Sequence, residues 1–446
     1  MLPGMAESSP PVPAFGHGTS DHRASDHAAS DHAASGHGAS GPGAFDPRAV
    51  IEGRVPGRIS VAFIAGIVIA AACAIVALGI DVLESFAAGD GVAPFVTALP
   101  LALLPVPLLV AVVLWVDRLE PEPRATLVFA FAWGAGIATL FALVINTAGL
   151  EYVTQPALGA STGEYVSATF GAPVVEETLK GLVLIGLLWR RRDELDGPTD
   201  GIIYAAMVGL GFAMMENVGY YINALITPER GGIALLGYTF VLRGVLAPLL
   251  HPIFTSMTGL GVAYAASRRH ATWAVPAGLL AAMGLHGIWN GLSRFGAAGL
   301  VAGYVIMFCV LVVLVMILVA DRRRLVALIR RYLPPYRATG LITGDDIAML
   351  GSLRQRRQAR NWARAAGGLP AAAAMGDYQL AATELALLHA KTRRGIVTGE
   401  TFAARQHDLL ALMYYARRAV ARHPGPPRAP WASEAGSAFT PGGRRS

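Results

Sequence analysis

The sequence predicts an all-α fold: a polytopic transmembrane helical bundle of about eight spans, followed by a small cytoplasmic helical C-terminal appendage. Of the 446 residues, 54% are hydrophobic and only 15% are charged, whereas soluble domains carry about 45–50% apolar and about 25% charged residues. The apolar residues gather in windows of about 20, the length of helix that crosses the roughly 30 Å hydrocarbon core of a bilayer. We therefore expect a multi-pass protein of the cell membrane.

Residues 1–50 precede the first apolar window and form an N-terminal tail with a histidine repeat. Histidines recur there every five residues from His17 to His37, among Ala, Ser and Gly. A segment this poor in apolar residues cannot offset the entropy of folding, so we expect it to be disordered. The regular histidines leave a metal-gathering arm open as an alternative. The tail is too long and too polar for a signal peptide, so the first span is expected to be an uncleaved anchor.

The membrane-embedded domain is expected over residues 59–320. The windows that are long and apolar enough to span a bilayer are 59–79, 93–116, 125–148, 167–189, 201–223, 245–267, 272–293 and 298–320. Residues 232–244 are also apolar, but they are short and end at Arg243. We interpret them as an interfacial or re-entrant lead into the sixth span.

Arginines at the ends of these windows predict the orientation of the chain. With the N-terminus inside, two arginines, Arg230 and Arg294, lie in the outer loops, apart from Arg243 in the lead into the sixth span. The arginines that flank the inner ends are Arg48, Arg54, Arg58, Arg118, Arg124, Arg190, Arg191, Arg192, Arg268, Arg269, Arg322, Arg323 and Arg324. Because positive residues collect on the cytoplasmic side, both termini are expected to be cytoplasmic. The same placement explains the net charge of +6 without a nucleic-acid partner.

Beyond the last window the composition becomes polar. Residues 334–422 show apolar side chains at steps of three and four, which predicts a cytoplasmic helical appendage of two or three helices. Residues 423–446 repeat Pro and Gly and are expected to be a disordered tail. Cys73 and Cys309 both lie inside apolar runs, which favours neither a disulfide framework nor a Cys-rich zinc site.

Four consecutive spans carry polar groups that an ordinary membrane helix excludes. Charges at the centre of a membrane helix cost at least about 2.5–3.5 kcal/mol, so they usually face a protein interior and mark functional sites. The residues, in span order, are Glu176, Glu177 and Lys180, then Glu216 and Asn217, then His251, then His286 and Asn290. Counted along each helix, Glu177, Glu216, His251 and His286 fall within roughly 6 Å of one level. We expect them to meet in one chamber in the outer half of the bilayer.

Two chemical schemes fit this set of side chains. Two imidazoles and a carboxylate form a common zinc ligand set, so His251, His286 and Glu216 are expected metal ligands, with a further glutamate as the base that accepts a water proton. Without metal, a glutamate activates water while Asn and His stabilise the oxyanion. The residues alone leave both schemes open.

The spacing on the fourth span predicts which glutamate is the base. Glu176 and Lys180 are four residues apart and share a helix face, so Lys180 is expected to offset Glu176 and leave Glu177 as the base. A rotation by one helix position would exchange the two. The expected supporting residues are Lys180, Asn217 and Asn290.

A proton- or cation-coupled membrane transporter is the alternative function, because buried Glu, His and Lys also build proton relays. We find no internal repeat that relates two halves of the chain, and the polar groups crowd into spans four to seven. Both observations disfavour a transporter.

The ordered set EETLK, FAMMEN, LLHPIF and GLHGIWN resembles the PrsW family of intramembrane proteases, within the wider group of CAAX-processing and bacteriocin-processing membrane proteases. The segment WVDRLEPEPRA after the second span resembles the acidic, proline-containing signature of many PrsW-like proteins. The resemblance covers roughly residues 60–320. In the related prenyl-protein proteases a histidine stands at the position of Glu216, which favours the PrsW branch over CAAX processing.

The resemblance implies an intramembrane endopeptidase of metalloprotease type that cuts membrane-anchored protein substrates in the lipid bilayer. It assigns the catalytic residues to Glu176, Glu177, Glu216, His251 and His286. In the best-known role of this branch the substrate is an anti-sigma factor cut on its extracytoplasmic side, which implies a regulatory substrate of that class.

Overall fold

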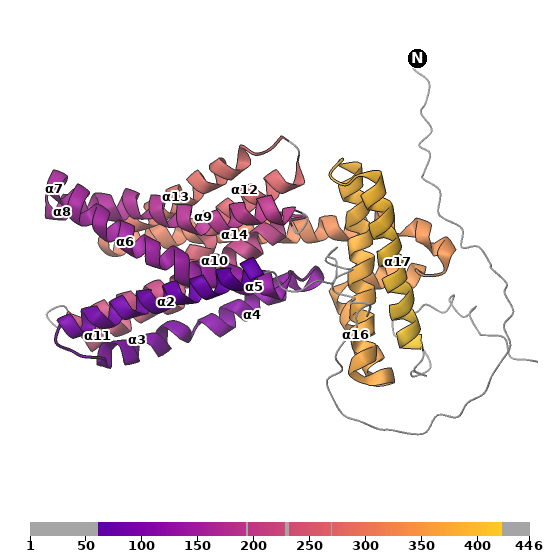
Figure 1. The fold of residues 1–446 in the computed structure, drawn as a ribbon, viewed down its shortest axis with the longest axis horizontal. Coiled ribbons are helices and arrows are strands. Elements are labelled where there is room, and N and C mark those ends of the chain that lie inside the picture. The colour runs from indigo at the N-terminus through magenta and orange to yellow at the C-terminus, as the bar shows by residue number, and fades with distance from the viewer. Residues whose placement is uncertain (1–60, 193–194, 228–231, 269, 422–446) are drawn as a thin grey trace, which may run out of the picture. The chain divides into compact units, whose positions relative to one another are not determined.

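The computed structural model describes residues 61–421, apart from 193–194, 228–231 and 269 (Figure 1). Every regular element in these residues is a helix, which confirms the all-α prediction. The two tails expected at 1–50 and 423–446 lie outside the described residues.

Helical segments occupy all eight expected windows. In chain order they are α2 (Val61–Ala87), α3 (Ala93–Leu103) with α4 (Val106–Val116), α5 (Arg124–Trp133) to α6 (Thr139–Gly149) and α7 (Gln155–Leu158), α8 (Ala160–Val166) with α9 (Ala172–Arg190), α10 (Pro198–Ile226), α11 (Ile233–Phe240) with α12 (Leu250–Ser267), α13 (Ala274–Ser293) and α14 (Gly296–Tyr332). The short turns η1 (Asp117–Leu119), η2 (Gly134–Ala138), η3 (Leu150–Thr154), η4 (Ser167–Gly171) and η7 (Val241–Leu246) connect or extend them.

Among the described residues, 6 helical stretches are long and apolar enough to cross a membrane, by length and composition alone. They run over Val61–Ala87, Ala93–Val116, Arg124–Leu158, Pro198–Ile226, Ile233–Ser267 and Gly296–Tyr332. The two expected spans outside this set, α9 and α13, both pack against α12. They carry many of the polar groups singled out above. The chain is therefore a polytopic membrane protein.

Helix α10 is the centre of the bundle, and glycines allow α12 to approach it closely. A Cβ placed on Gly201 of α10 would lie 2.2 Å from the carbonyl oxygen of Gly259 of α12. Further along, a Cβ on Gly209 would lie 2.6 Å from the backbone nitrogen of Pro252. Small residues let membrane helices pack backbone to backbone. This contact fixes the start of α12, and with it His251, against α10.

The lead into the sixth span is helical. Helix α11 continues into the π-helical turn η7, and after Ala247–Leu249 the chain begins α12 at Leu250, five residues later than the expected start at 245. Arg243 lies in η7 and packs toward α10.

Helix α14 continues beyond the expected end of the last span at residue 320 and stops at Tyr332. Its last turns share a hydrophobic cluster with η8 (Pro334–Thr339), α15 (Gly344–Leu350), α16 (Leu353–Arg393) and α17 (Gly399–Ala421). Helix α16 bends at Gly367 and Gly368, and Gly368 has a φ of +69° that only glycine adopts readily. The C-terminal helices are thus built onto the extension of α14.

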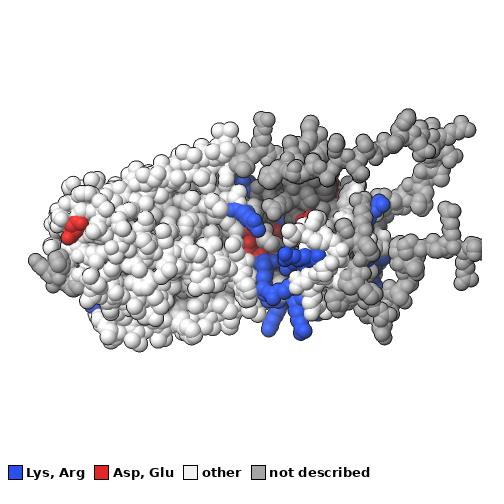
Figure 2. All heavy atoms as spheres, turned by 90° about the horizontal axis from the view of Figure 1, so that it is seen from below, with Lys and Arg blue, Asp and Glu red and all other residues white. Residues whose placement is uncertain are grey.

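Figure 2 shows a bundle surface with few charged side chains, and Lys and Arg gathered near the end where α14 leaves it. Exposed arginines of α14 there include Arg322, Arg323, Arg330 and Arg331. This distribution is typical of a membrane domain with one arginine-rich boundary.

We expect Gly201→Ala to lower the stability of the bundle, because the new methyl group would overlap the Gly259 carbonyl. Overpacking of this kind costs roughly 1–3 kcal/mol, which thermal unfolding of the detergent-solubilised protein would detect. Gly186→Ala in α9 is the matched control, since no atom lies within 4 Å of its Cβ position. Equal melting temperatures for the two variants would contradict the close α10–α12 contact.

Candidate active site

Helix α9 places two carboxylates around one buried lysine. Lys180 Nζ lies 2.9 Å from Glu177 Oε1 and 3.2 Å from Glu176 Oε2. The ammonium also lies 3.6 Å from the centroid of the Phe212 ring. Residues three and four apart share a helix face, so Lys180 can reach both carboxylates at once. One positive charge therefore compensates two adjacent negative ones inside the bundle.

Glu177 is wholly enclosed by its partners. Besides Lys180, the hydroxyl of Thr255 donates to Glu177 Oε2 at 3.0 Å, and His286 Nδ1 lies 3.1 Å from Glu177 Oε1. The residue is 0% exposed. Glu177 therefore contacts the ring of His286 and has no exposed atom in this structure.

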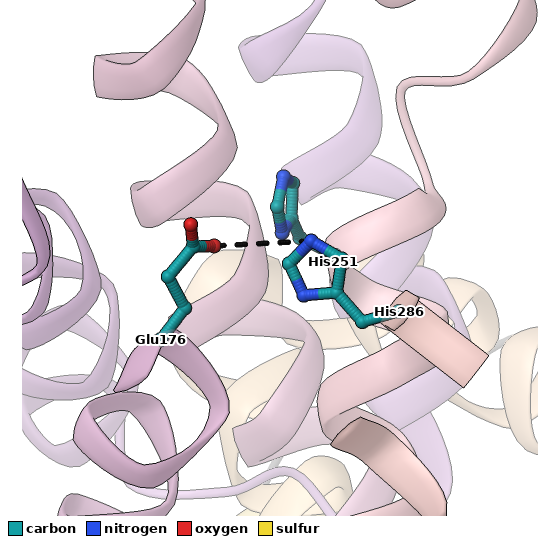
Figure 3. Close-up of side chains that lie close together, drawn as sticks. All are labelled: Glu176, His251 and His286. Atoms are coloured by element: carbon teal, nitrogen blue, oxygen red, sulfur yellow. Dashed lines mark ion pairs between the residues drawn. The ribbon is translucent and has the colours of Figure 1, made fainter. Parts of the chain in front are cut away.

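Glu176 has the more open carboxylate. Its Oε1 accepts a hydrogen bond from Asn146 Nδ2 at 3.3 Å, and its Oε2 lies 3.9 Å from His286 Nε2 (Figure 3). The second distance is too long for a direct hydrogen bond. Of the two glutamates, Glu176 is the one whose oxygen faces an imidazole nitrogen without touching it.

His251 lies between two charged groups. Its Nε2 is 2.7 Å from Glu216 Oε2 and its Nδ1 is 2.9 Å from Lys180 Nζ. The two imidazoles meet edge to face with centroids 5.3 Å apart, and the ring of Phe254 stacks on His286 at 4.7 Å. Hydrogen bonds and aromatic neighbours thus hold both rings in place.

Arg243 is a member of this network that the sequence analysis did not assign to the site. Its Nη2 donates to Glu216 Oε2, and its Nε donates to Asn217 Oδ1 at 2.8 Å. The guanidinium also lies 3.7 Å from the centroid of the Tyr220 ring. A lone arginine at the end of an apolar segment was the available signal, because such a charge has to find a carboxylate partner.

The remaining polar residues support the frame. Asn290 Nδ2 donates to the carbonyl of Ala168 in η4 at 2.9 Å, which ties α13 to the turn that precedes α9. Thr255 and Asn146 were also missed. Thr255 follows His251 by four residues and so shares its helix face, but a single Asn in the third span gives no comparable signal.

The structure brings all five expected catalytic residues into one network. The carboxylate grouped with the two histidines is Glu176, whereas the expected ligand set contained Glu216. Glu176, His251 and His286 each offer a ligand atom, all within 4.8 Å of one another. A carboxylate with two imidazoles suits zinc. Glu216 contacts His251 Nε2 at 2.7 Å, and carboxylates commonly make such contacts with metal-binding histidines.

The donor set fits zinc with one condition. The Lys180 ammonium lies within hydrogen-bond distance of both Glu176 Oε2 and His251 Nδ1. An ion held by these atoms therefore requires the ammonium to move away from them.

Comparison with known proteins places these residues in a matched region. The model of the PrsW family intramembrane metalloprotease matches residues 122–319, which include every residue of the network above. The Protease PrsW of Geobacillus kaustophilus is 30% identical over 180 residues, 40% of this chain and 70% of that protein. The Protease PrsW of Clostridioides difficile is 32% identical over 143 residues, 32% of this chain and 55% of that protein. No solved structure matches the chain.

We expect Arg243→Gln to destabilise the site, because Glu216 would keep a partly buried negative charge without its cation. The loss should be roughly 1–3 kcal/mol, less than for a fully buried pair because both side chains are partly exposed. Thermal unfolding would measure it, and adding Glu216→Gln should restore part of the loss. Arg294→Gln is the control, since its ion pair with Glu164 is exposed. A loss for Arg294→Gln as large as that for Arg243→Gln would count against a specific role for Arg243.

Proposed function

Because the chain belongs to the PrsW family of membrane proteases, we propose that it is an intramembrane endopeptidase that hydrolyses membrane-anchored proteins. The observation that carries the proposal is the enclosed cluster of Glu176, His251 and His286, held by three helices inside an apolar bundle. Hydrolysis inside a bilayer needs a polar chamber of this kind, since water has to be held and activated where it is otherwise excluded.

We assign the proton-accepting role to Glu176. A water molecule held between Glu176 Oε2 and His286 Nε2 would give its proton to the carboxylate while its oxygen attacks the carbonyl carbon of the scissile peptide. Glu176 would then return the proton to the leaving nitrogen as the carbon–nitrogen bond breaks. Lys180 Nζ lies 3.2 Å from the same oxygen.

Two carboxylate–imidazole pairs orient the histidines for this step. Glu177 contacts His286 Nδ1 and Glu216 contacts His251 Nε2, so each ring presents its other nitrogen toward Glu176 or Lys180. In this assignment Glu177 and Glu216 are positioning residues.

As the second scheme we propose zinc as the cofactor, held by Glu176, His251 and His286; in that scheme Glu176 would be a metal ligand and not the proton acceptor. Bound there, zinc would polarise the scissile carbonyl and lower the pKa of a bound water. Glu177 and Glu216 would keep the two imidazoles in orientation, and Lys180 would turn away from His251 Nδ1 toward Glu177.

For the substrate we propose regulatory membrane-tethered proteins of the anti-sigma-factor type, cut toward the extracytoplasmic side of the bilayer. The support is the position of the site, which lies away from the arginine-rich end of the bundle. With that end cytoplasmic, both termini are cytoplasmic as well.

Glu176→Gln should reduce cleavage about 10²–10⁴-fold, because the amide cannot accept the proton of water. Glu177→Gln should have a smaller effect that acts through the orientation of His286. Cleavage of a membrane-tethered reporter by purified protein in detergent measures both, and it separates a protease from a transporter. Glu164→Gln, at an exposed residue of α8, is the control. If Glu177→Gln abolished cleavage while Glu176→Gln cleaved at a near-normal rate, the two assignments would be reversed.

Purified protein should contain about one zinc ion per chain and lose activity on treatment with a chelator. His251→Ala and His286→Ala should each lose the metal together with activity, since both supply ligands. Asn290→Ala, which removes only a contact to the Ala168 carbonyl, should keep the metal. Full activity of metal-free protein would exclude zinc as the cofactor and leave the protease assignment standing.

The proposed orientation can be checked with single cysteines in a Cys73→Ser and Cys309→Ser background. Leu158→Cys, exposed at the end of α7, should react with a membrane-impermeant maleimide in intact cells. Ala373→Cys, exposed in α16, should react only after lysis. The opposite labelling pattern would place the appendage outside the cell.

A further inference from the structure

A cavity of about 390 Å³ lies at the arginine-rich end of the bundle, between α4, α14 and α16. The walls formed by α4 and α14 are apolar. They consist of Val112, Trp115 and Val116 of α4 and Val315, Leu318 and Val319 of α14. Trp115 is 59% exposed, Val112 48% and Val315 49%. The cavity is therefore open on the side where these helices face lipid chains.

Three arginines line the cavity where its apolar walls end. Arg118 of η1 and Arg322 and Arg324 of α14 line it, and Arg118 lies over the Trp115 ring at 4.4 Å. Burial, followed by the charges of Arg322, Arg357 and Arg360, lowers the pKa of Arg118. Guanidinium groups from two elements thus converge at the level where the apolar walls end.

The carboxylates that line the same cavity are engaged elsewhere. Asp321 accepts hydrogen bonds from Arg324 Nη1 and Thr199 Oγ1, both at 2.8 Å. Asp196 pairs with Lys391 at 2.7 Å. Two more accept from the backbone: Asp200 from the nitrogens of residues 196 and 197, and Asp117 from that of residue 122.

Glu120 also lines the cavity, and its pKa is raised well above the usual value by burial and by neighbouring carboxylates. Within the described residues, no ion pair with a carboxylate is found for Arg118 or Arg322, so these two guanidinium groups have donors left for an anion.

We propose that this cavity binds an anionic phospholipid, with its acyl chains along α4 and α14 and its phosphate beside Arg118 and Arg322. Arginine presents a planar fork of donors that matches phosphate oxygens. Basic pockets between membrane helices at the cytoplasmic side suit anionic headgroups. Because Leu353 and Leu387 of α16 also line the cavity, the bound lipid would contact the bundle and the C-terminal helices together.

Native mass spectrometry of the full-length protein, titrated in detergent with dioleoyl phosphatidylglycerol or dioleoyl phosphatidylcholine, tests this site. The wild type should bind phosphatidylglycerol roughly tenfold more tightly, and Arg118→Gln with Arg322→Gln should remove that preference. The matched control is Arg323→Gln with Arg331→Gln, which removes the same charge from exposed positions of α14 outside this cavity and should keep the preference.

Four results would overturn the proposal. Equal affinity of the wild type for the two lipids would exclude an anionic site, and an equal loss in both double variants would indicate general surface charge. Displacement of the lipid by millimolar inorganic phosphate would indicate a site for soluble anions. If the Arg118 and Arg322 double variant does not fold, Val319→Trp, which fills the apolar wall, should weaken phosphatidylglycerol binding about tenfold, and unchanged binding would contradict the site.

Discussion

The contact of Lys180 with Glu176, Glu177 and His251 is the interaction on which the rest of the bundle depends. Charged groups inside a membrane domain persist only when they are paired and hydrogen-bonded. A fully buried ammonium between two carboxylates fixes the rotation of α9, because the face that carries Glu176, Glu177 and Lys180 has to point into the bundle. Once α9 is fixed, α12 and α13 have to present polar partners to it, and they do so through Thr255, His251 and His286.

The surrounding helices satisfy this demand by close packing. Glycines let the backbone of α12 lie against α10, and this brings His251 within reach of both Glu216 and Lys180. Arg243 then balances Glu216 from the neighbouring turn η7. The charges therefore form a connected series from η7 through α10 and α12 to α9, and removing one member leaves the next without its partner.

Much of this arrangement could be predicted from sequence. Hydropathy located the helices, and the polar residues of four consecutive spans identified the network, since charge buried in a bilayer persists only where polar partners surround it. The choice of Glu177 over Glu176 as the base rested on spacing alone. Adjacent residues on a helix point about 100° apart, so spacing does not fix which of the two faces the site. Glu216 was expected to bind metal because its type and depth suit a ligand. Its contact with His251 Nε2 could not be foreseen, because it depends on tertiary structure.

Tertiary contacts also decide features at the ends of helices that sequence patterns do not reveal. Arg243 was visible as an isolated charge, but its partners lie on α10, 26 and 27 residues away in sequence. Helix α14 was expected to stop at residue 320, where hydropathy falls at the arginine run. The helix continues because Leu325, Ile329 and Leu333 are buried in the C-terminal cluster, and a hydropathy window does not detect that amphipathic pattern.

Helix α14 has a mechanical consequence. It is 37 residues long, about 55 Å, with no proline and no glycine after Gly303. Such a helix is stiff, so a rotation of one of its ends also moves the other. The C-terminal end of α14 is packed among the C-terminal helices. Nearer its N-terminal end, Tyr304 packs on Trp289 of α13. The hydroxyl of Tyr304 donates to the carbonyl of Leu242, the residue before Arg243. Torque applied to the C-terminal helices would therefore reach the helix of His286 and the turn of Arg243 together.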